Sequence, residues 1–76
     1  MTRKFLLLTR EGCELCEEFE HAVIEHYGAG SIELAREDVD SREDWRRRYG
    51  LRVPVLLDEW NEVIAEGHFA PPAEET

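Results

Sequence analysis

Basic residues are scarce in this sequence. Its 76 residues include 9 Lys and Arg against 18 Asp and Glu, which gives a formal net charge of −9. Because nucleic acids and anionic membrane surfaces are bound through clustered basic side chains, this balance argues against both classes of partner. The single basic run, residues 46–48, follows acidic residues on an expected helix and is interpreted as a solvated helix face.

Long hydrophobic runs are absent as well. The apolar run from Phe5 to Leu8 is soon followed by Arg10. It is shorter than the about 7–15 apolar residues of a signal peptide and far shorter than the about 20 of a membrane-spanning helix. We therefore expect a cytoplasmic protein.

Cysteine is limited to two residues, Cys13 and Cys16. Two cysteines cannot form the multi-bridge framework of a small secreted domain, and a close pair in a reducing compartment is typical of catalytic or metal-binding sites. The length predicts one domain over residues 1–76, near the lower limit for a self-sufficient core. Residues 69–76 are expected to form a short Pro-rich tail with room for one turn of helix at most.

The hydrophobic pattern that is present predicts the order β-α-β-α-β-β. A strand, a crossover helix and a strand imply a parallel pair, whereas the last two strands are close enough in sequence to form an antiparallel hairpin. The expected elements are strands at residues 5–9, 32–39, 53–57 and 62–65, a helix between Gly12 and Gly28, and a helix between Asp40 and Gly50.

Local signals mark the ends of both helices. Gly28 and Gly30 follow the last apolar position of the first helix, as glycine does beyond a helix C-terminus. Ser41 and Asp44 are spaced like a capping box, which predicts the start of the second helix.

The two cysteines form a C-x-x-C motif between the first strand and the first helix. At a helix N-terminus the macrodipole places about +0.5 charge, which stabilises a thiolate on Cys13. Arg10 favours that thiolate further, while neighbouring glutamates oppose it. Cys16 lies one helical turn on, so Cys13 is expected to attack a substrate disulfide and Cys16 to resolve the mixed disulfide.

A second notable pair is Val53-Pro54, at the expected start of the third strand. Proline lacks a backbone N–H, so a strand opener is its ordinary role. If this loop faces the C-x-x-C motif, a cis peptide would form a tight turn and leave a backbone edge beside the sulfur atoms.

Two segments together resemble the small bacterial glutaredoxin-like proteins of the thioredoxin superfamily. They are LTREGCELCE at residues 8–17 and YGLRVPV at residues 49–55, and the resemblance covers roughly residues 4–68. It implies a thioredoxin-like fold with a mixed four-stranded sheet, Cys13 as nucleophile, Cys16 as resolving thiol and Pro54 as the cis-proline opposite them. Arg10 occupies a place where many glutaredoxins carry a basic residue.

The sequence also departs from that family pattern. Glu14-Leu15 replaces the usual Pro and Tyr between the cysteines, and His68 follows Gly67 where a Gly-Gly pair helps to hold glutathione; both weaken the case for glutathione binding. The C-terminal helix is missing or vestigial.

Without that helix, part of the sheet is expected to lack cover. Apolar side chains such as Phe5, Leu7, Val55 or Leu57 should then be partly exposed or covered by a partner, which predicts a weak homodimer.

The sequence therefore predicts a dithiol glutaredoxin-like oxidoreductase, active in cell redox homeostasis. Catalysis is assigned to Cys13 and Cys16, and substrate binding to Arg10, Val53 and Pro54. The partner is a disulfide-containing protein or a low-molecular-weight thiol. We expect no bound cofactor or metal, with glutathione or thioredoxin reductase as electron donor.

Two other interpretations stay open. In the first, the fold is a non-catalytic adaptor, with Trp60 as a candidate exposed contact. In the second, the motif binds Cu, Zn or an iron–sulfur cluster. A zinc site using His21 and His26 conflicts with the usual wider spacing between ligand pairs and with the outward direction expected for His21.

Overall fold

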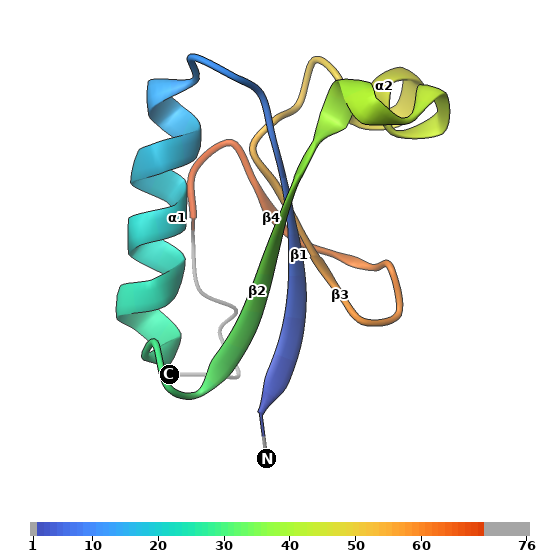
Figure 1. The fold of residues 1–76 in the computed structure, drawn as a ribbon. Coiled ribbons are helices and arrows are strands. Elements are labelled where there is room, and N and C mark those ends of the chain that lie inside the picture. Colours follow the sequence, from blue (N-terminus) through green and yellow to red (C-terminus); the bar gives the residue numbers. More distant parts are fainter. Residues whose placement is uncertain (1, 70–76) are drawn as a thin grey trace.

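The computed structural model describes residues 2–69, which form a four-stranded sheet flanked by helices (Figure 1). The expected order of strands and helices is confirmed, with one additional 3-10 turn before the second helix. The elements are β1 (Arg3–Thr9), α1 (Glu14–Tyr27), β2 (Ile32–Asp38), η1 (Val39–Ser41), α2 (Glu43–Tyr49), β3 (Val55–Asp58) and β4 (Val63–Glu66).

The sheet is mixed, with the strand order β2-β1-β3-β4. β1 pairs in parallel with β2 and antiparallel with β3, and β3 and β4 form the expected antiparallel hairpin. Leu8 lies opposite Val55 in the β1–β3 pair. This register places the loop that leaves β1 beside the loop that enters β3, at one end of the sheet.

Both faces of the sheet contribute to the core. Leu7 packs in a cluster with Phe19 of α1, whereas its neighbour Leu8 packs in a cluster with Val39 and Tyr49 of η1 and α2. Successive side chains of a strand point to opposite faces, so β1 carries apolar residues at both parities. The continuous apolar run in the sequence was therefore correctly interpreted as a strand buried on both sides.

The expectation of exposed sheet residues is wrong. Phe5, Leu7, Val55 and Leu57 are each 4% exposed or less. One face is covered by α1 together with Phe69, and the other by η1 and α2. The homodimer stays a prediction, but it loses the uncovered sheet face from which it was inferred.

The first helix follows its sequence signals closely. Cys16, Phe19 and Val23 are its buried residues, at the spacing of one helical face. Gly28 ends the helix with φ 87°, and its N–H donates to the carbonyl of Ile24 at 2.7 Å. This is a left-handed conformation that glycine adopts without steric cost.

The predicted capping box at the second helix is wrong. The Ser41 hydroxyl donates to the Asp38 carbonyl at 2.7 Å, and Asp44 pairs with Arg42. The chain makes the η1 turn first, because the Asp38 carboxylate accepts from the N–H of Asp40 at 2.8 Å. α2 then begins at Glu43 without a side-chain cap.

The last hairpin is shorter than the sequence predicted. β3 begins at Val55, after a cis peptide bond between Val53 and Pro54, because Pro54 has no N–H to donate to the sheet. The Asp58 carboxylate accepts from the N–H groups of Trp60 and Glu62, which closes the turn before β4.

No helix follows β4 within residues 2–69. Most of the predicted tail, residues 70–76, lies outside the described part of the chain. Among the described residues, no helix is long and apolar enough to cross a membrane.

Candidate functional site

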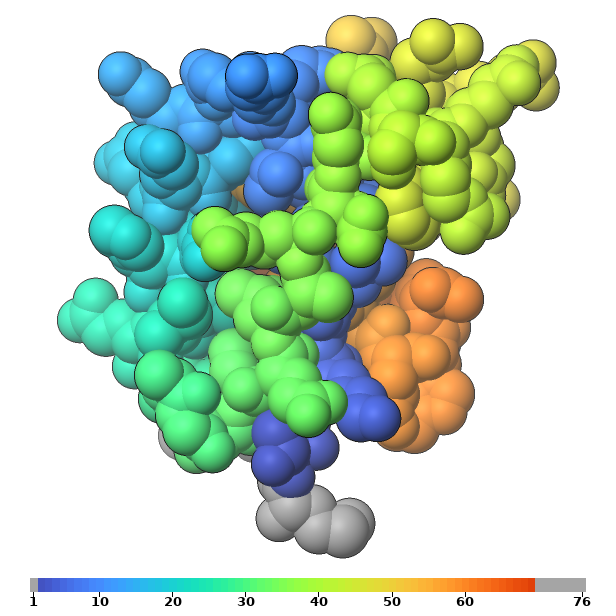
Figure 2. Space-filling view, viewed as in Figure 1, coloured from blue at the N-terminus to red at the C-terminus, as the bar shows by residue number. Residues whose placement is uncertain are grey.

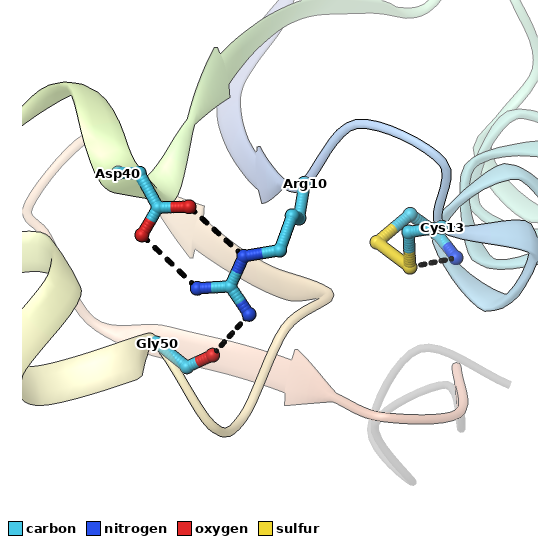
Figure 3. The surroundings of a disulfide bond; sticks show 5 residues. Arg10, Cys13, Asp40 and Gly50 are labelled. Atoms are coloured by element: carbon cyan, nitrogen blue, oxygen red, sulfur yellow. Dashed lines mark hydrogen bonds and ion pairs between the residues drawn. A yellow bond between two sulfur atoms is a disulfide. The ribbon is translucent and has the colours of Figure 1, made fainter.

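Cys13 and Cys16 lie where β1 passes into α1. Cys13 is the N-cap residue of α1, and it follows Gly12, whose φ of 75° makes the turn out of the strand. The two cysteines form a disulfide with their Cα atoms 5.2 Å apart (Figure 3). This is the helix N-terminal position that the sequence predicted for the motif.

The two cysteines differ in their access to solvent. Cys13 is partly exposed, whereas Cys16 is buried with 3% of its surface accessible. The backbone N–H of Cys16 donates to Sγ of Cys13 at 3.0 Å. Such a donor, together with the helix dipole, stabilises negative charge on that sulfur. An incoming group therefore has access to Cys13 before Cys16.

Arg10 lies three residues before Cys13, but its side chain is directed elsewhere. Figure 3 shows the guanidinium extending away from the disulfide toward Asp40 and Gly50. Nε and Nη2 donate to the two Asp40 oxygens at 2.9 and 3.1 Å, and Nη1 donates to the Gly50 carbonyl at 2.8 Å. The described contacts of Arg10 thus join three segments of the chain, and its predicted role in substrate binding stays a prediction.

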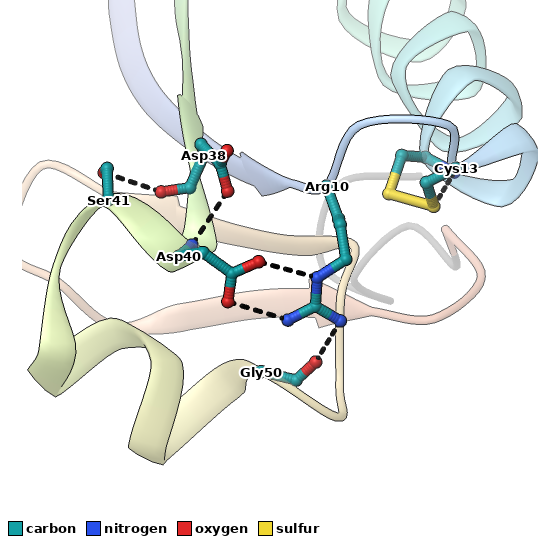
Figure 4. Close-up of polar contacts among 7 residues, drawn as sticks. Arg10, Cys13, Asp38, Asp40, Ser41 and Gly50 are labelled. Atoms are coloured by element: carbon teal, nitrogen blue, oxygen red, sulfur yellow. Dashed lines mark hydrogen bonds and ion pairs between the residues drawn. A yellow bond between two sulfur atoms is a disulfide. The ribbon is translucent and has the colours of Figure 1, made fainter.

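The Arg10–Asp40 pair perturbs both titrating groups. The hydrogen bond from Arg10 is the main cause that holds the pKa of Asp40 below its ordinary value. The same bond raises the pKa of the Arg10 guanidinium. Asp40 is itself positioned by the capped η1 turn, in which the Asp38 carboxylate accepts from its N–H (Figure 4).

A cavity of about 210 Å³ adjoins the disulfide. Figure 2 shows this hollow between α1 and the green strand β2. Its walls come from the β1–α1 loop, the first turns of α1 and one residue of β2: Thr9, Arg10, Glu11, Gly12, Cys13, Cys16, Glu17, Glu20 and Arg36. The cavity therefore gives direct access to both cysteines.

Two charged residues of this cavity were missed by the sequence analysis. Arg36 of β2 donates to the Glu20 carboxylate of α1 at 3.2 Å. Glu20 was assigned only to the polar side of the helix, and Arg36 only to an irregular part of a strand. The parallel β1–β2 pairing was the one available signal, since it places the end of β2 beside the end of β1.

Val53 and Pro54 do not line this cavity. Pro54 is buried, and its carbonyl accepts from the N–H of Gly67 at 2.9 Å. Val53 packs against the cluster on the α2 side of the sheet. The cis peptide between them agrees with the family resemblance, and their role in substrate binding stays a prediction.

The structure does not assemble the zinc ligands considered for the sequence. His21 is exposed while Cys16 is buried, as the helical spacing predicted. Within residues 2–69, no group of three or more His, Cys, Asp or Glu side chains is arranged to hold a metal ion.

Comparison with known proteins places this architecture in a family. The model of the glutaredoxin-like domain family (DUF836) matches residues 4–74. Comparison with curated proteins gives no match.

Two solved structures are similar. The X-ray structure of the structural genomics target XcR50 from X. campestris has a TM-score of 0.69 and 27% identity, covering 93% of this chain and 89% of that chain. A structure described as a malarial protein has a TM-score of 0.52 and 23% identity over 93% and 85% of the two chains, and supports the fold alone. The fold is thioredoxin-like, and the chain belongs to the glutaredoxin-like domain family.

Proposed function

We propose that this protein is a thiol–disulfide oxidoreductase in which Cys13 attacks and Cys16 resolves. The observation that carries the proposal is the asymmetry of the pair, with Cys13 partly exposed at the helix N-terminus and Cys16 buried behind it. An attacking sulfur must be reached by a large substrate, whereas a resolving sulfur needs to reach only its neighbour.

The reaction starts from the reduced pair. The Cys13 thiolate attacks one sulfur of a substrate disulfide, the substrate S–S bond breaks, and one substrate sulfur leaves as a thiolate. Cys16 then loses its proton and attacks Sγ of Cys13, which releases the second substrate thiolate. Two electrons pass to the substrate, and the protein is left with the Cys13–Cys16 disulfide.

Return to the dithiol requires two electrons from outside the chain. Two molecules of a low-molecular-weight thiol such as glutathione, or a thioredoxin reductase, would supply them without a bound organic cofactor. Parallel assays with glutathione plus its reductase and with thioredoxin reductase identify the donor. A role in cytoplasmic redox homeostasis follows from this activity.

The assignment of the two cysteines is tested with Cys13→Ser and Cys16→Ser. Each variant is mixed with an insulin disulfide substrate and analysed by mass spectrometry under non-reducing conditions. We expect Cys16→Ser to accumulate the mixed disulfide and Cys13→Ser to accumulate none. Equal trapping by both variants would contradict the assigned roles.

The redox activity itself has a separate test. Treatment with dithiothreitol should add two hydrogens to the mass of the oxidised wild-type protein, and insulin reduction should turn over repeatedly. A protein that shows neither change with any thiol donor, but binds a stoichiometric metal ion, would support the metal-binding interpretation instead.

A further inference from the structure

The cavity beside the disulfide has an unequal charge balance. Its charged walls consist of two arginines and three glutamates, namely Arg10, Arg36, Glu11, Glu17 and Glu20. The disulfide therefore reacts in a field set by these five side chains and by the N-terminus of α1.

Both arginines are already paired. Arg10 is held by the Asp40 carboxylate, which lies outside the cavity walls, and Arg36 is held by Glu20. Glu11 and Glu17 are exposed, and none of the basic side chains in residues 2–69 pairs with either of them. Two carboxylates beside Cys13 are thus left without a cationic partner.

The helix N-terminus offsets only part of this charge. The macrodipole is equivalent to about +0.5 of an elementary charge, and it acts within the first turn. Glu14 and Glu18 add two more exposed carboxylates to the first turns of the same helix. An anionic thiol that approaches Cys13 therefore meets net repulsion, whereas a cationic one meets attraction.

Resting on the proposed function, we propose that the exchange partner of this site is a protein thiol or disulfide with Lys or Arg beside its cysteine. Glu11 and Glu17 are the specificity-determining residues. The same field makes small anionic thiols, glutathione among them, poor partners in comparison. A cationic segment supplies the charges that the cavity lacks among its own unpaired side chains.

The proposal is tested on reduction of the oxidised protein by cysteine peptides. A peptide thiolate attacks Sγ of Cys13, a peptide–Cys13 bond forms, the Cys13–Cys16 bond breaks, and Cys16 leaves as a thiolate that takes up a proton. A second peptide thiolate attacks the peptide sulfur of the mixed disulfide. It yields a peptide disulfide and the Cys13 thiolate, so two electrons enter the protein.

Three peptides of equal length are compared, with cores Lys-Cys-Lys, Gln-Cys-Gln and Glu-Cys-Glu. Each rate is divided by the rate of the same peptide with the neutral disulfide of 2-mercaptoethanol, which removes differences in intrinsic thiol reactivity. We expect the Lys peptide to exceed the Glu peptide by about tenfold at low ionic strength. The ratio should fall toward one in about 1 M salt, where screening is strong.

Matched variants locate the effect. The double variant Glu11→Gln/Glu17→Gln removes the two unpaired carboxylates, and Glu59→Gln/Glu62→Gln removes the same charge from the β3–β4 turn, at the opposite end of the sheet (Figure 1). We expect the first to reduce the Lys-to-Glu ratio about threefold and the second to leave it unchanged.

Equal normalised rates for the three peptides, or equal ratios in the two double variants, would overturn the charge inference while leaving the oxidoreductase proposal in place. Failure of every peptide and of dithiothreitol to reduce the disulfide would overturn both.

Discussion

Both carboxylate oxygens of Asp40 accept hydrogen bonds from the guanidinium of Arg10, which lies thirty residues earlier in the chain (Figure 4). A third guanidinium N–H binds the Gly50 carbonyl at the end of α2. One side chain therefore ties the loop that carries Cys13 to η1 and to the end of α2. The disulfide loop is anchored on the sheet face opposite α1 as well as by α1 itself.

The first prediction concerns Asp40→Asn and pH. The folded pKa of Asp40 is lowered from its ordinary value of 3.8, so the folded state favours the carboxylate. Its contribution to stability is present above pH 3.8 and is lost as pH falls through the lower, folded-state pKa. Thermal unfolding should show Asp40→Asn less stable than the wild type near neutral pH, with a difference that shrinks on acidification.

Asp44→Asn is the matched control for that experiment. Asp44 is also paired with an arginine, but this partner, Arg42, is only two residues away and both side chains are largely exposed. We expect this variant to follow the wild-type curve at every pH. A constant difference between Asp40→Asn and the wild type down to strong acid would contradict a contribution from Asp40 ionisation.

The second prediction concerns Gly50. A Cβ atom at this position would overlap the Arg46 carbonyl, and Gly50 is buried, so the neighbouring backbone would have to move. We expect Gly50→Ala to lower the free energy of unfolding by about 1–3 kcal/mol. Gly30→Ala meets no atom within 4 Å and should leave stability unchanged or raise it by up to about 1 kcal/mol. Urea unfolding of both variants distinguishes a local clash from a general effect of replacing glycine.

The third prediction tests the core on the α2 side. Leu8 is fully buried against Val39 and Tyr49, and Leu8→Ala should cost about 2–5 kcal/mol. A domain of this size has roughly 3–5 kcal/mol of stability, so the variant should be partly unfolded at room temperature by circular dichroism. Leu51→Ala removes a fully exposed leucine and should change stability by less than about 0.5 kcal/mol. Equal stability of the two variants would mean that η1 and α2 do not cover the sheet as described.

Short-range patterns in the sequence predicted most of the fold. The period of α1, its end at Gly28 and the position of Cys13 at its start depend on residues within a few turns of one another, where side-chain spacing is decisive. Burial of Cys16 and exposure of His21 follow from the same helical spacing.

Long-range pairings could not be predicted in this way. Ser41 and Asp44 have capping-box spacing, yet Asp38 captures the Asp40 N–H first and the chain turns earlier. The contact of Arg10 with Asp40 depends on the β1–β2 register, which brings the ends of both strands together. The pairing of Arg36 with Glu20 depends on how α1 crosses β2. Neither contact leaves a local signal in the sequence.

The final prediction separates the hydrogen-bond geometry of Arg10 from its charge. Arg10→Lys keeps the positive charge, but a single ammonium group cannot reproduce the fork that binds both Asp40 oxygens and the Gly50 carbonyl. We expect its melting temperature to lie closer to that of Arg10→Gln than to that of the wild type.

The two Arg10 variants should differ in their preference for charged peptides. Arg10→Lys should keep the wild-type ratio of Lys-peptide to Glu-peptide rates, because the charge beside the cavity is preserved. Arg10→Gln should raise that ratio, since it leaves the Asp40 carboxylate without its cation. Wild-type stability in Arg10→Lys would show that charge alone is sufficient at this position, and would restore the substrate-binding role predicted from the sequence as the better account of Arg10.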